Sequence, residues 1–146
     1  MPEGKLEKTL HVPATHDSIR LIIDETLPLL EESGEERKIV NKVRLVLEEL
    51  LVNVVSYAYD GGEGYIDIHT EITFDPKNLL IVIKDGGKPF DPTAKKDPDL
   101  NVPLKDRPIG GLGIFLVKQT MDEVIYERVN DENVLTLKKK LEAIPA

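Results

Sequence analysis

A long amphipathic pattern in the first half of the chain predicts its central helix. Between Glu35 and Tyr59, apolar residues recur at intervals of three and four, the spacing that places side chains on one face of an α-helix. This face comprises Ile39, Val40, Val43, Val46, Leu47, Leu50, Leu51 and Val54. Glu49 and Asn53 lie one helical turn apart at the border of the face. A carboxylate and a carboxamide there are either ordinary helix-edge residues or parts of a site between the core and a cleft.

The residues before this helix predict a strand and a first helix. Leu6–Val12 alternates weakly between apolar and polar residues, which indicates an edge or swapped strand that Pro13 ends. Thr15 is placed to cap the helix that follows. The apolar face of that helix comprises Ile19, Ile22, Ile23, Leu27 and Leu30.

Four residues predict where the two helices end and begin. Pro28 lies inside the first helical pattern, so a kink or an early stop is expected there. Gly34 suits the end of the first helix, because glycine readily adopts the left-handed conformation of a C-terminal cap. Ser33 and Glu36 have the spacing of a capping box for the second helix.

The second half of the chain predicts mostly strands. Leu79–Lys84 is a nearly continuous apolar run, which predicts a central strand buried on both faces. The segment 88–109 contains five prolines without periodicity and predicts a long functional loop. The other predicted elements are strands at Tyr65–Thr73, Asp122–Val129 and Val134–Leu141 and a short helix at Ile114–Met121. This order predicts a single α+β domain over residues 1–146, a two-layer sandwich with helices packed on one face of a mixed β-sheet.

Composition narrows the classes of partner. The net charge of −8, without any basic run, argues against nucleic-acid or membrane-surface binding. The chain has no cysteine, which excludes a disulfide framework and suits a cytoplasmic protein. The three histidines, His11, His16 and His69, are too scattered along the chain to predict a ligand set.

Asp85-Gly86-Gly87 follows directly on the predicted central strand. An Asp-Gly pair after a strand often makes a hairpin turn, but the next residues do not predict a returning strand. A carboxylate at the end of a central strand can accept a hydrogen bond from an exocyclic amine, and Gly87 would let a flat ring approach the backbone. The segment therefore indicates either a turn or a base-reading site.

Gly110-Gly111-Leu112-Gly113 precedes the short helix pattern. Successive backbone N–H groups at a helix start form an anion site that suits phosphate, although a flexible hinge would also explain these glycines. The segment lacks the Gly-Lys-Ser/Thr of a Walker loop and the preceding strand of a Rossmann fingerprint.

Together these features match the requirements of a Mg·ATP site. Mg²⁺ takes oxygen ligands and needs only one or two from the protein when phosphates and water supply the rest, so Asn53 alone could serve. Glu49, one turn away, lies within reach of a hydroxyl or water aligned with a γ-phosphate.

In this order, the segments resemble the GHKL (Bergerat-fold) ATPases and, more closely, the anti-sigma-factor serine kinases of bacteria. The resemblance covers nearly the whole chain and is specific only as a set. The segments that carry it are Glu49–Asn53 followed by Ala58-Tyr59, Asp85–Asp91, Gly111–Ile114 and Met121–Val124.

The resemblance implies a function and a role for each residue. It implies an ATP-binding anti-sigma factor that holds a sigma factor and phosphorylates a STAS-type anti-anti-sigma partner on serine, typically as a homodimer. The implied roles are general base for Glu49, Mg²⁺ ligand for Asn53, adenine recognition for Asp85, room for the ring at Gly87, and phosphate contacts for Gly111 and Gly113 from a mobile lid, 88–109.

One departure from the family pattern keeps an alternative open. Some members carry an arginine just before the lid glycines, whereas here Arg107 is displaced by about two residues. Arg107 would still be the catalytic contact to the γ-phosphate, but the alternative is a regulatory module that binds a protein partner without phosphoryl transfer. Relatives also carry a threonine near the adenine, for which Asn133 and Thr136 are both candidates. A histidine kinase is disfavoured, because no dimerisation helix with a phospho-acceptor histidine precedes the domain.

Overall fold

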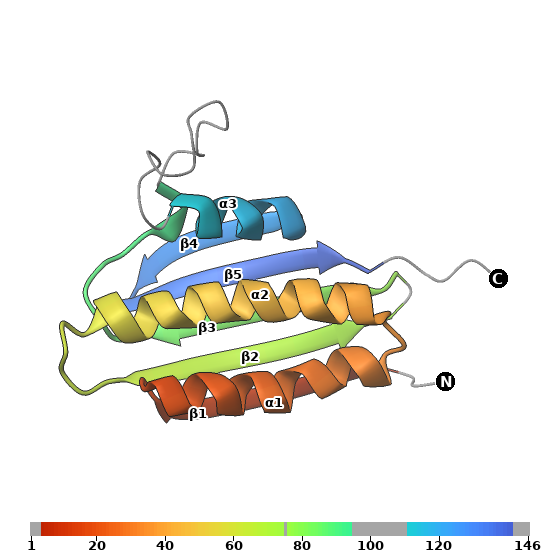
Figure 1. Cartoon of the computed structure of the whole chain (residues 1–146), viewed down its shortest axis with the longest axis horizontal. Helices are drawn as coiled ribbons and strands as arrows, with labels where there is room; N and C mark the ends of the chain where they lie inside the picture. The colour runs from red at the N-terminus through yellow and green to blue at the C-terminus, as the bar shows by residue number, and fades with distance from the viewer. Residues whose placement is uncertain (1–3, 75, 95–110, 142–146) are drawn as a thin grey trace.

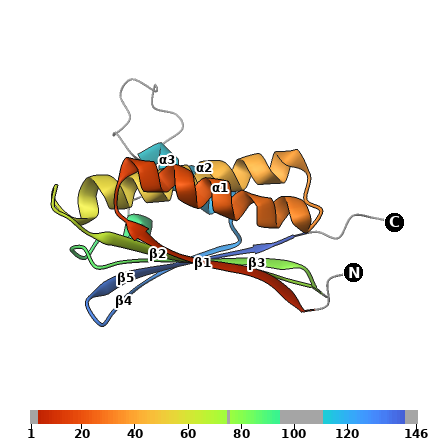
Figure 2. The same ribbon diagram turned by 90° about the horizontal axis from the view of Figure 1, so that it is seen from below.

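Three α-helices lie on one face of a five-stranded sheet, and the other face of the sheet carries no helix (Figures 1 and 2). This computed structural model describes residues 4–74, 76–94 and 111–141, and the elements counted here lie within those ranges. The strands are β1 (Lys5–Pro13), β2 (Tyr65–Thr73), β3 (Asn78–Asp85), β4 (Glu123–Val129) and β5 (Glu132–Lys140). The helices are α1 (His16–Glu32), α2 (Arg37–Asn53) and α3 (Gly111–Thr120), with a 3₁₀ turn at Pro92–Ala94. The predicted two-layer α+β sandwich is confirmed.

The strands are ordered β1-β2-β3-β5-β4, and every neighbouring pair is antiparallel. The prediction of a mixed sheet is therefore wrong. β3 and β4 do run in the same direction, as expected for two strands joined through a helix, but β5 lies between them. The β4–β5 hairpin turns at Asn130 and Asp131, both with positive φ, and inserts β5 beside β3.

The hydrophobic core lies between the helices and the helix-facing side of the sheet. In β2 the residues Ile66, Ile68 and Ile72 are buried, and the residues between them point to the open face. The prediction that β3 is buried on both faces is wrong, since it alternates in the same way and Leu80 and Val82 are only half-buried. Its apolar run reflects a central position under a single layer of helices. None of the described helices is both long and apolar enough to cross a membrane.

The boundaries of α1 follow the predicted caps except at the proline. Thr15 is the N-cap, and its side chain accepts a hydrogen bond from the Ser18 N–H at 3.2 Å. Pro28 does not stop the helix, which runs to Glu32. Pro28 and Asp24, whose carbonyl would otherwise be the partner at this turn, are both exposed, so water can satisfy that carbonyl.

The junction between α1 and α2 is a Schellman motif and not a capping box. Gly34 has φ of +91°, and the N–H groups of Gly34 and Glu35 donate to the carbonyls of Glu31 and Leu30. The predicted Ser33–Glu36 capping box is wrong, because Ser33 instead donates its hydroxyl to the Leu30 carbonyl. Glu36 is the N-cap of α2 and makes no side-chain capping bond.

The last turn of the central helix is wider than an α-helical turn. After Asn53 the chain continues as a π-helix over Val54–Ala58. The periodicity correctly predicted a helical end near Tyr57, but the change of winding carried no sequence signal. Single π turns often occur at functional sites, and this one follows directly on a predicted metal ligand.

Candidate functional site

Two of the predicted site residues meet at the C-terminal end of α2. Asn53 is the last residue of α2, and Asp85 is the last residue of β3. Both line one cavity together with Ala58, Phe90 and Asn133. The cavity has a volume of about 30 Å³, enough for one or two water molecules.

Asp85 is buried, and only one of its two carboxylate oxygens accepts hydrogen bonds from the protein. The side chain is 5% exposed, and its Oδ1 accepts hydrogen bonds from the Gly87 N–H and from Asn133 Nδ2, both at 2.9 Å. Oδ2 has no hydrogen-bond partner among the described residues. Burial raises the pKa of Asp85, and the two hydrogen bonds and the positive charge of Arg128 counteract part of that rise. An acceptor atom thus remains available beside the cavity.

Asn133 connects four segments around Asp85. Its Nδ2 also donates to the Lys88 carbonyl at 2.8 Å. Its Oδ1 accepts from the Tyr126 hydroxyl at 2.5 Å, from the Phe90 N–H at 3.2 Å and from Arg128 Nη1 at 3.2 Å. This network fixes the segment after β3 against β4 and β5.

Of the two candidates for the position near the adenine, Asn133 and Thr136, only Asn133 contacts Asp85. Asn133 is paired in register with Asp85 and faces the helices. Thr136 is paired with Val82 and points to the open face of the sheet, away from the cavity. The contributions of Tyr126 and Arg128 were missed, since only the register of β4 against β5 brings them to Asn133.

Gly87 allows the chain after β3 to approach the end of the π-helix. A Cβ atom at Gly87 would lie 2.3 Å from the Ala58 carbonyl oxygen and 2.5 Å from Ala58 Cβ. The Lys88 N–H donates to the same carbonyl at 2.8 Å, and the Gly87 carbonyl accepts from Arg128 Nη1 at 2.7 Å. Gly87 therefore has a packing role here, and room for an adenine ring beside it stays a prediction.

Replacing Gly87 by alanine is expected to lower the free energy of unfolding by about 1–3 kcal/mol, the usual cost of forcing extra volume into a packed position. The methyl group would meet backbone atoms of Ala58, which cannot turn aside. Gly86→Ala is the matched control, because its methyl group meets the end of the Tyr65 side chain. Urea unfolding of both variants measures the difference. Equal destabilisation by the two would contradict this role for Gly87.

Tyr59 fastens the Asp85–Gly87 segment to the start of β2. Its hydroxyl accepts hydrogen bonds from the Gly86 N–H at 2.7 Å and the Tyr65 N–H at 3.2 Å, and donates to the Tyr65 carbonyl at 2.7 Å. Burial raises the pKa of Tyr59, which keeps the hydroxyl protonated and able to donate. One side chain thereby links the segment that follows Asp85 to the start of β2.

Glu49 lies against the first turn of α3. A Cβ atom at Gly113 would lie 2.1 Å from Glu49 Oε1 and 2.6 Å from Oε2, so a larger residue there would displace this carboxylate from its present position. Glu49 is half-buried, and its side chain makes no hydrogen bond or ion pair with any described residue. The start of a helix favours negative charge, which makes this a suitable place for an unpaired carboxylate.

The remaining predicted site residues are described only in part. Arg107, Gly110 and most of the segment 88–109 lie outside the described residues. Gly111 is the first residue of α3, so the helix begins three residues before the predicted start at Ile114. The roles of Arg107, Gly111 and Gly113 toward phosphate stay predictions.

Comparisons with known proteins agree with this architecture. Residues 12–139 match the histidine kinase-like ATPase domain. Serine-protein kinase RsbW of Staphylococcus aureus strains JH9 and Newman is 31% identical over 123 residues, covering 79% of this chain and 75% of the relative. The solved RsbU and RsbW domains of a Mycobacterium tuberculosis protein share the fold, with a TM-score of 0.61 and 18% identity over 91% of this chain, which spans only 32% of the solved one. As the resemblance predicted, the chain belongs to the histidine kinase-like ATPase domain family, and its sequence relatives there are serine-protein kinases.

Proposed function

We propose that the protein is an ATP-dependent protein serine kinase that also acts as an anti-sigma factor. It phosphorylates a STAS-type anti-anti-sigma factor and regulates transcription by switching between that partner and a sigma factor. The family match and the relation to RsbW support an ATP-binding kinase of this partner-switching type. The two partners are proposed only by class, as a sigma factor and a STAS-domain protein.

One observation carries the proposal: three side chains with unused polar atoms gather at the end of α2. Glu49 has an unpaired carboxylate at the start of α3. The side chain of Asn53, one turn further along α2, makes no hydrogen bond with any described residue. Asp85 keeps Oδ2 available beside the same cavity as Asn53. Polar atoms without protein partners in a concave region are available to a ligand, so three of them near one another support a ligand site.

These residues fit Mg·ATP. The amide oxygen of Asn53 would hold Mg²⁺, which neutralises phosphate charge when bound. Asp85 Oδ2 would accept a hydrogen bond from the adenine amine. A purine ring is several times larger than a water molecule, so Phe90 and Pro92 must move to admit it into the cavity.

Glu49 would act as the general base. Its carboxylate would accept the proton of the substrate serine hydroxyl while that oxygen attacks the γ-phosphate. Arg107 would stabilise the γ-phosphate, and the backbone N–H groups of Gly111 and Gly113 would contact the phosphates. A cytoplasmic homodimer is proposed on family resemblance alone.

Calorimetric titration followed by a phosphate-transfer assay tests the proposal. ATP is expected to bind only with Mg²⁺ present, and label from [γ-³²P]ATP is expected to reach a serine of a STAS-domain protein from the same genome. The control is the same STAS protein with that serine changed to alanine. ATP binding without transfer to any candidate would refute the kinase and favour a regulatory module that acts without phosphoryl transfer.

A further inference from the structure

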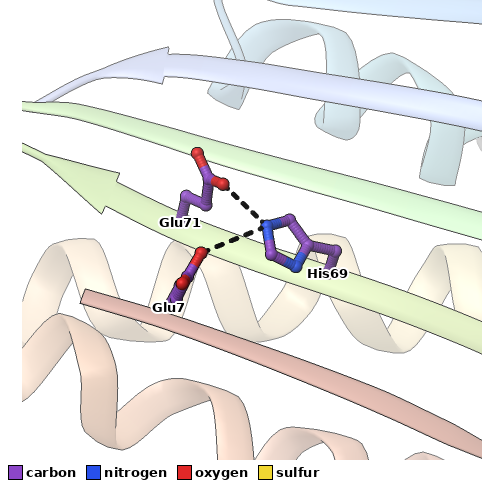
Figure 3. Close-up of side chains that lie close together, drawn as sticks. All are labelled: Glu7, His69 and Glu71. Atoms are coloured by element: carbon purple, nitrogen blue, oxygen red, sulfur yellow. Dashed lines mark hydrogen bonds and ion pairs between the residues drawn. The ribbon is translucent and has the colours of Figure 1, made fainter. Parts of the chain in front are cut away.

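A cluster of three potential metal ligands lies on the open face of the sheet, away from the nucleotide site. Glu7 of β1 and Glu71 of β2 converge on the ring of His69, which is also in β2 (Figure 3). His69 Nε2 is 2.8 Å from Glu71 Oε1 and 3.8 Å from Glu7 Oε2. The three ligand atoms all lie within 4.8 Å of one another. Sequence spacing gave no sign of this set, because its members are brought together only by pairing of β1 with β2.

Strand register explains the convergence. β1 and β2 are antiparallel, and Glu7 stands directly opposite Glu71. Side chains alternate between the faces of a strand, so Glu7, His69 and Glu71 share the face that no helix covers. Like charges directly opposite on a sheet repel each other, so this pair gains from a cation between them.

Thr9 orients the imidazole ring. Its Oγ1 lies 2.6 Å from His69 Nδ1, and Thr9 is the residue opposite His69 in the ladder. Without a metal ion, Nε2–H donates to Glu71 Oε1 at 2.8 Å and Nδ1 accepts from the Thr9 hydroxyl. A metal ion would replace that Nε2 proton, and Nδ1–H would then donate to the Thr9 hydroxyl. Histidine ligands of metals are typically held in this way through the nitrogen that does not bind the metal.

We infer that Glu7, His69 and Glu71 form a binding site for a divalent transition-metal ion of the Zn²⁺ class. Ligand atoms around tetrahedral Zn²⁺ lie about 3.4 Å apart, as follows from Zn–N and Zn–O distances of about 2.1 Å. The observed separations of 2.8 and 3.8 Å bracket this value, so small side-chain rotations suffice. One imidazole and two carboxylates favour Zn²⁺ over Mg²⁺, which prefers oxygen ligands alone. The fourth position faces solvent.

Lys5 competes for this site in the metal-free protein. Its Nζ lies 3.3 Å from Glu7 Oε2 and 3.3 Å from Glu71 Oε1, so the ammonium takes the place of a cation between the carboxylates. The lysine side chain is 47% exposed and can swing into solvent when a metal ion binds. Removing its charge therefore strengthens metal binding.

Titration of the full chain with ZnCl₂, without nucleotide and in a non-chelating buffer, tests the site. One Zn²⁺ per chain is expected, with affinity at least tenfold lower in His69→Gln, and Mg²⁺ in excess is expected not to displace it. His11→Gln is the matched control, since His11 is exposed on the same face of β1 and is not a member of the set. Unchanged thermal unfolding of each variant without zinc confirms that the fold is retained.

The Lys5→Gln variant provides a second, independent test of the metal site. Loss of an exposed ion pair is expected to raise the Zn²⁺ affinity by up to about fivefold. The inference is overturned if the wild type binds no Zn²⁺, if His69→Gln binds as tightly as the wild type, or if His11→Gln loses as much affinity as His69→Gln. It is also overturned if Lys5→Gln weakens binding or if Mg²⁺ competes equally. None of these outcomes depends on kinase activity, so the metal site is tested independently of the proposed function.

Discussion

Asp85→Asn is expected to weaken ATP binding by roughly 10- to 100-fold, the factor that corresponds to losing one hydrogen bond to a charged group. In the wild type, Oδ1 is held by Gly87 and Asn133, and Oδ2 is the atom that can accept from the adenine amine. Asparagine keeps an oxygen for the two internal bonds. It places an NH₂ group where Oδ2 was, so this hydrogen-bond donor would face the adenine amine, which is also a donor.

The same substitution is expected to leave the fold as stable as the wild type, or more stable, at neutral pH. Burial makes the ionised form of Asp85 unfavourable, and the neutral amide removes that cost while it keeps both internal hydrogen bonds. Calorimetry with Mg·ATP and thermal unfolding measure the two effects. Asp122→Asn, a change at an exposed carboxylate at the start of β4, is the control. If Asp85→Asn bound ATP as tightly as the wild type, Asp85 would not be part of the ATP site.

A dependence on pH accompanies this effect. Because the pKa of Asp85 is higher in the folded than in the unfolded chain, the folded protein takes up a proton more readily. Its protonation therefore adds stability as pH falls through the raised folded pKa, and this contribution is complete below the unfolded value. The difference in free energy of unfolding between Asp85→Asn and the wild type should shrink from pH 7 toward pH 4. A constant difference would show that Asp85 does not titrate in this range.

Glu49→Gln is expected to slow phosphate transfer by about 10²- to 10⁴-fold, the usual contribution of a general base. ATP binding should be unchanged or tighter, because a negative charge beside the phosphates is lost. Glutamine has the same size, so it should still fit against Gly113. Single-turnover transfer and calorimetry together separate catalysis from binding.

Glu48→Gln is the matched control for this experiment. Glu48 directly precedes Glu49 on α2 and pairs with Arg44 at 3.2 Å on the helix surface, outside the cavity. Transfer by this variant should equal that of the wild type. If Glu49→Gln kept full transfer activity, another group would have to be the base, and Glu49 would be an ordinary helix-edge residue.

Local patterns in the sequence were sufficient to predict most of the elements. The strict alternation of Tyr65–Thr73 gave β2 with its observed bounds, since a half-buried strand needs that period. Thr15 and Gly34 gave the ends of α1, because capping depends on neighbouring residues only. Glu49 and Asn53 were predicted as site residues because they border an apolar helix face, and Asp85 because it follows an apolar strand. The structure brings Asn53 and Asp85 to one cavity.

The features that depend on contacts between distant segments could not be predicted. The place of β5 between β3 and β4 follows from packing of a whole hairpin, so a mixed sheet was expected instead. Asn133 became a partner of Asp85 only through the register of β5 against β3. The predicted capping box at Ser33 does not form, because Ser33 belongs to the C-terminal turn of α1 that the Schellman motif at Gly34 ends. A local motif predicts a structure only when no neighbouring motif competes for its atoms.

In the proposed function, the small cavity beside Asp85 also affects the rates at which a nucleotide binds and dissociates. Phe90 stacks on Tyr57 with ring centroids 6.2 Å apart, and the cavity behind it holds about 30 Å³. In the proposed function a purine would enter this cavity only after lining residues such as Phe90 move, so the association rate is expected to reach a plateau at high ATP concentration, at the rate of opening. The same movement precedes departure. The time that a nucleotide remains bound would therefore be governed in part by one aromatic contact in the wall of the cavity.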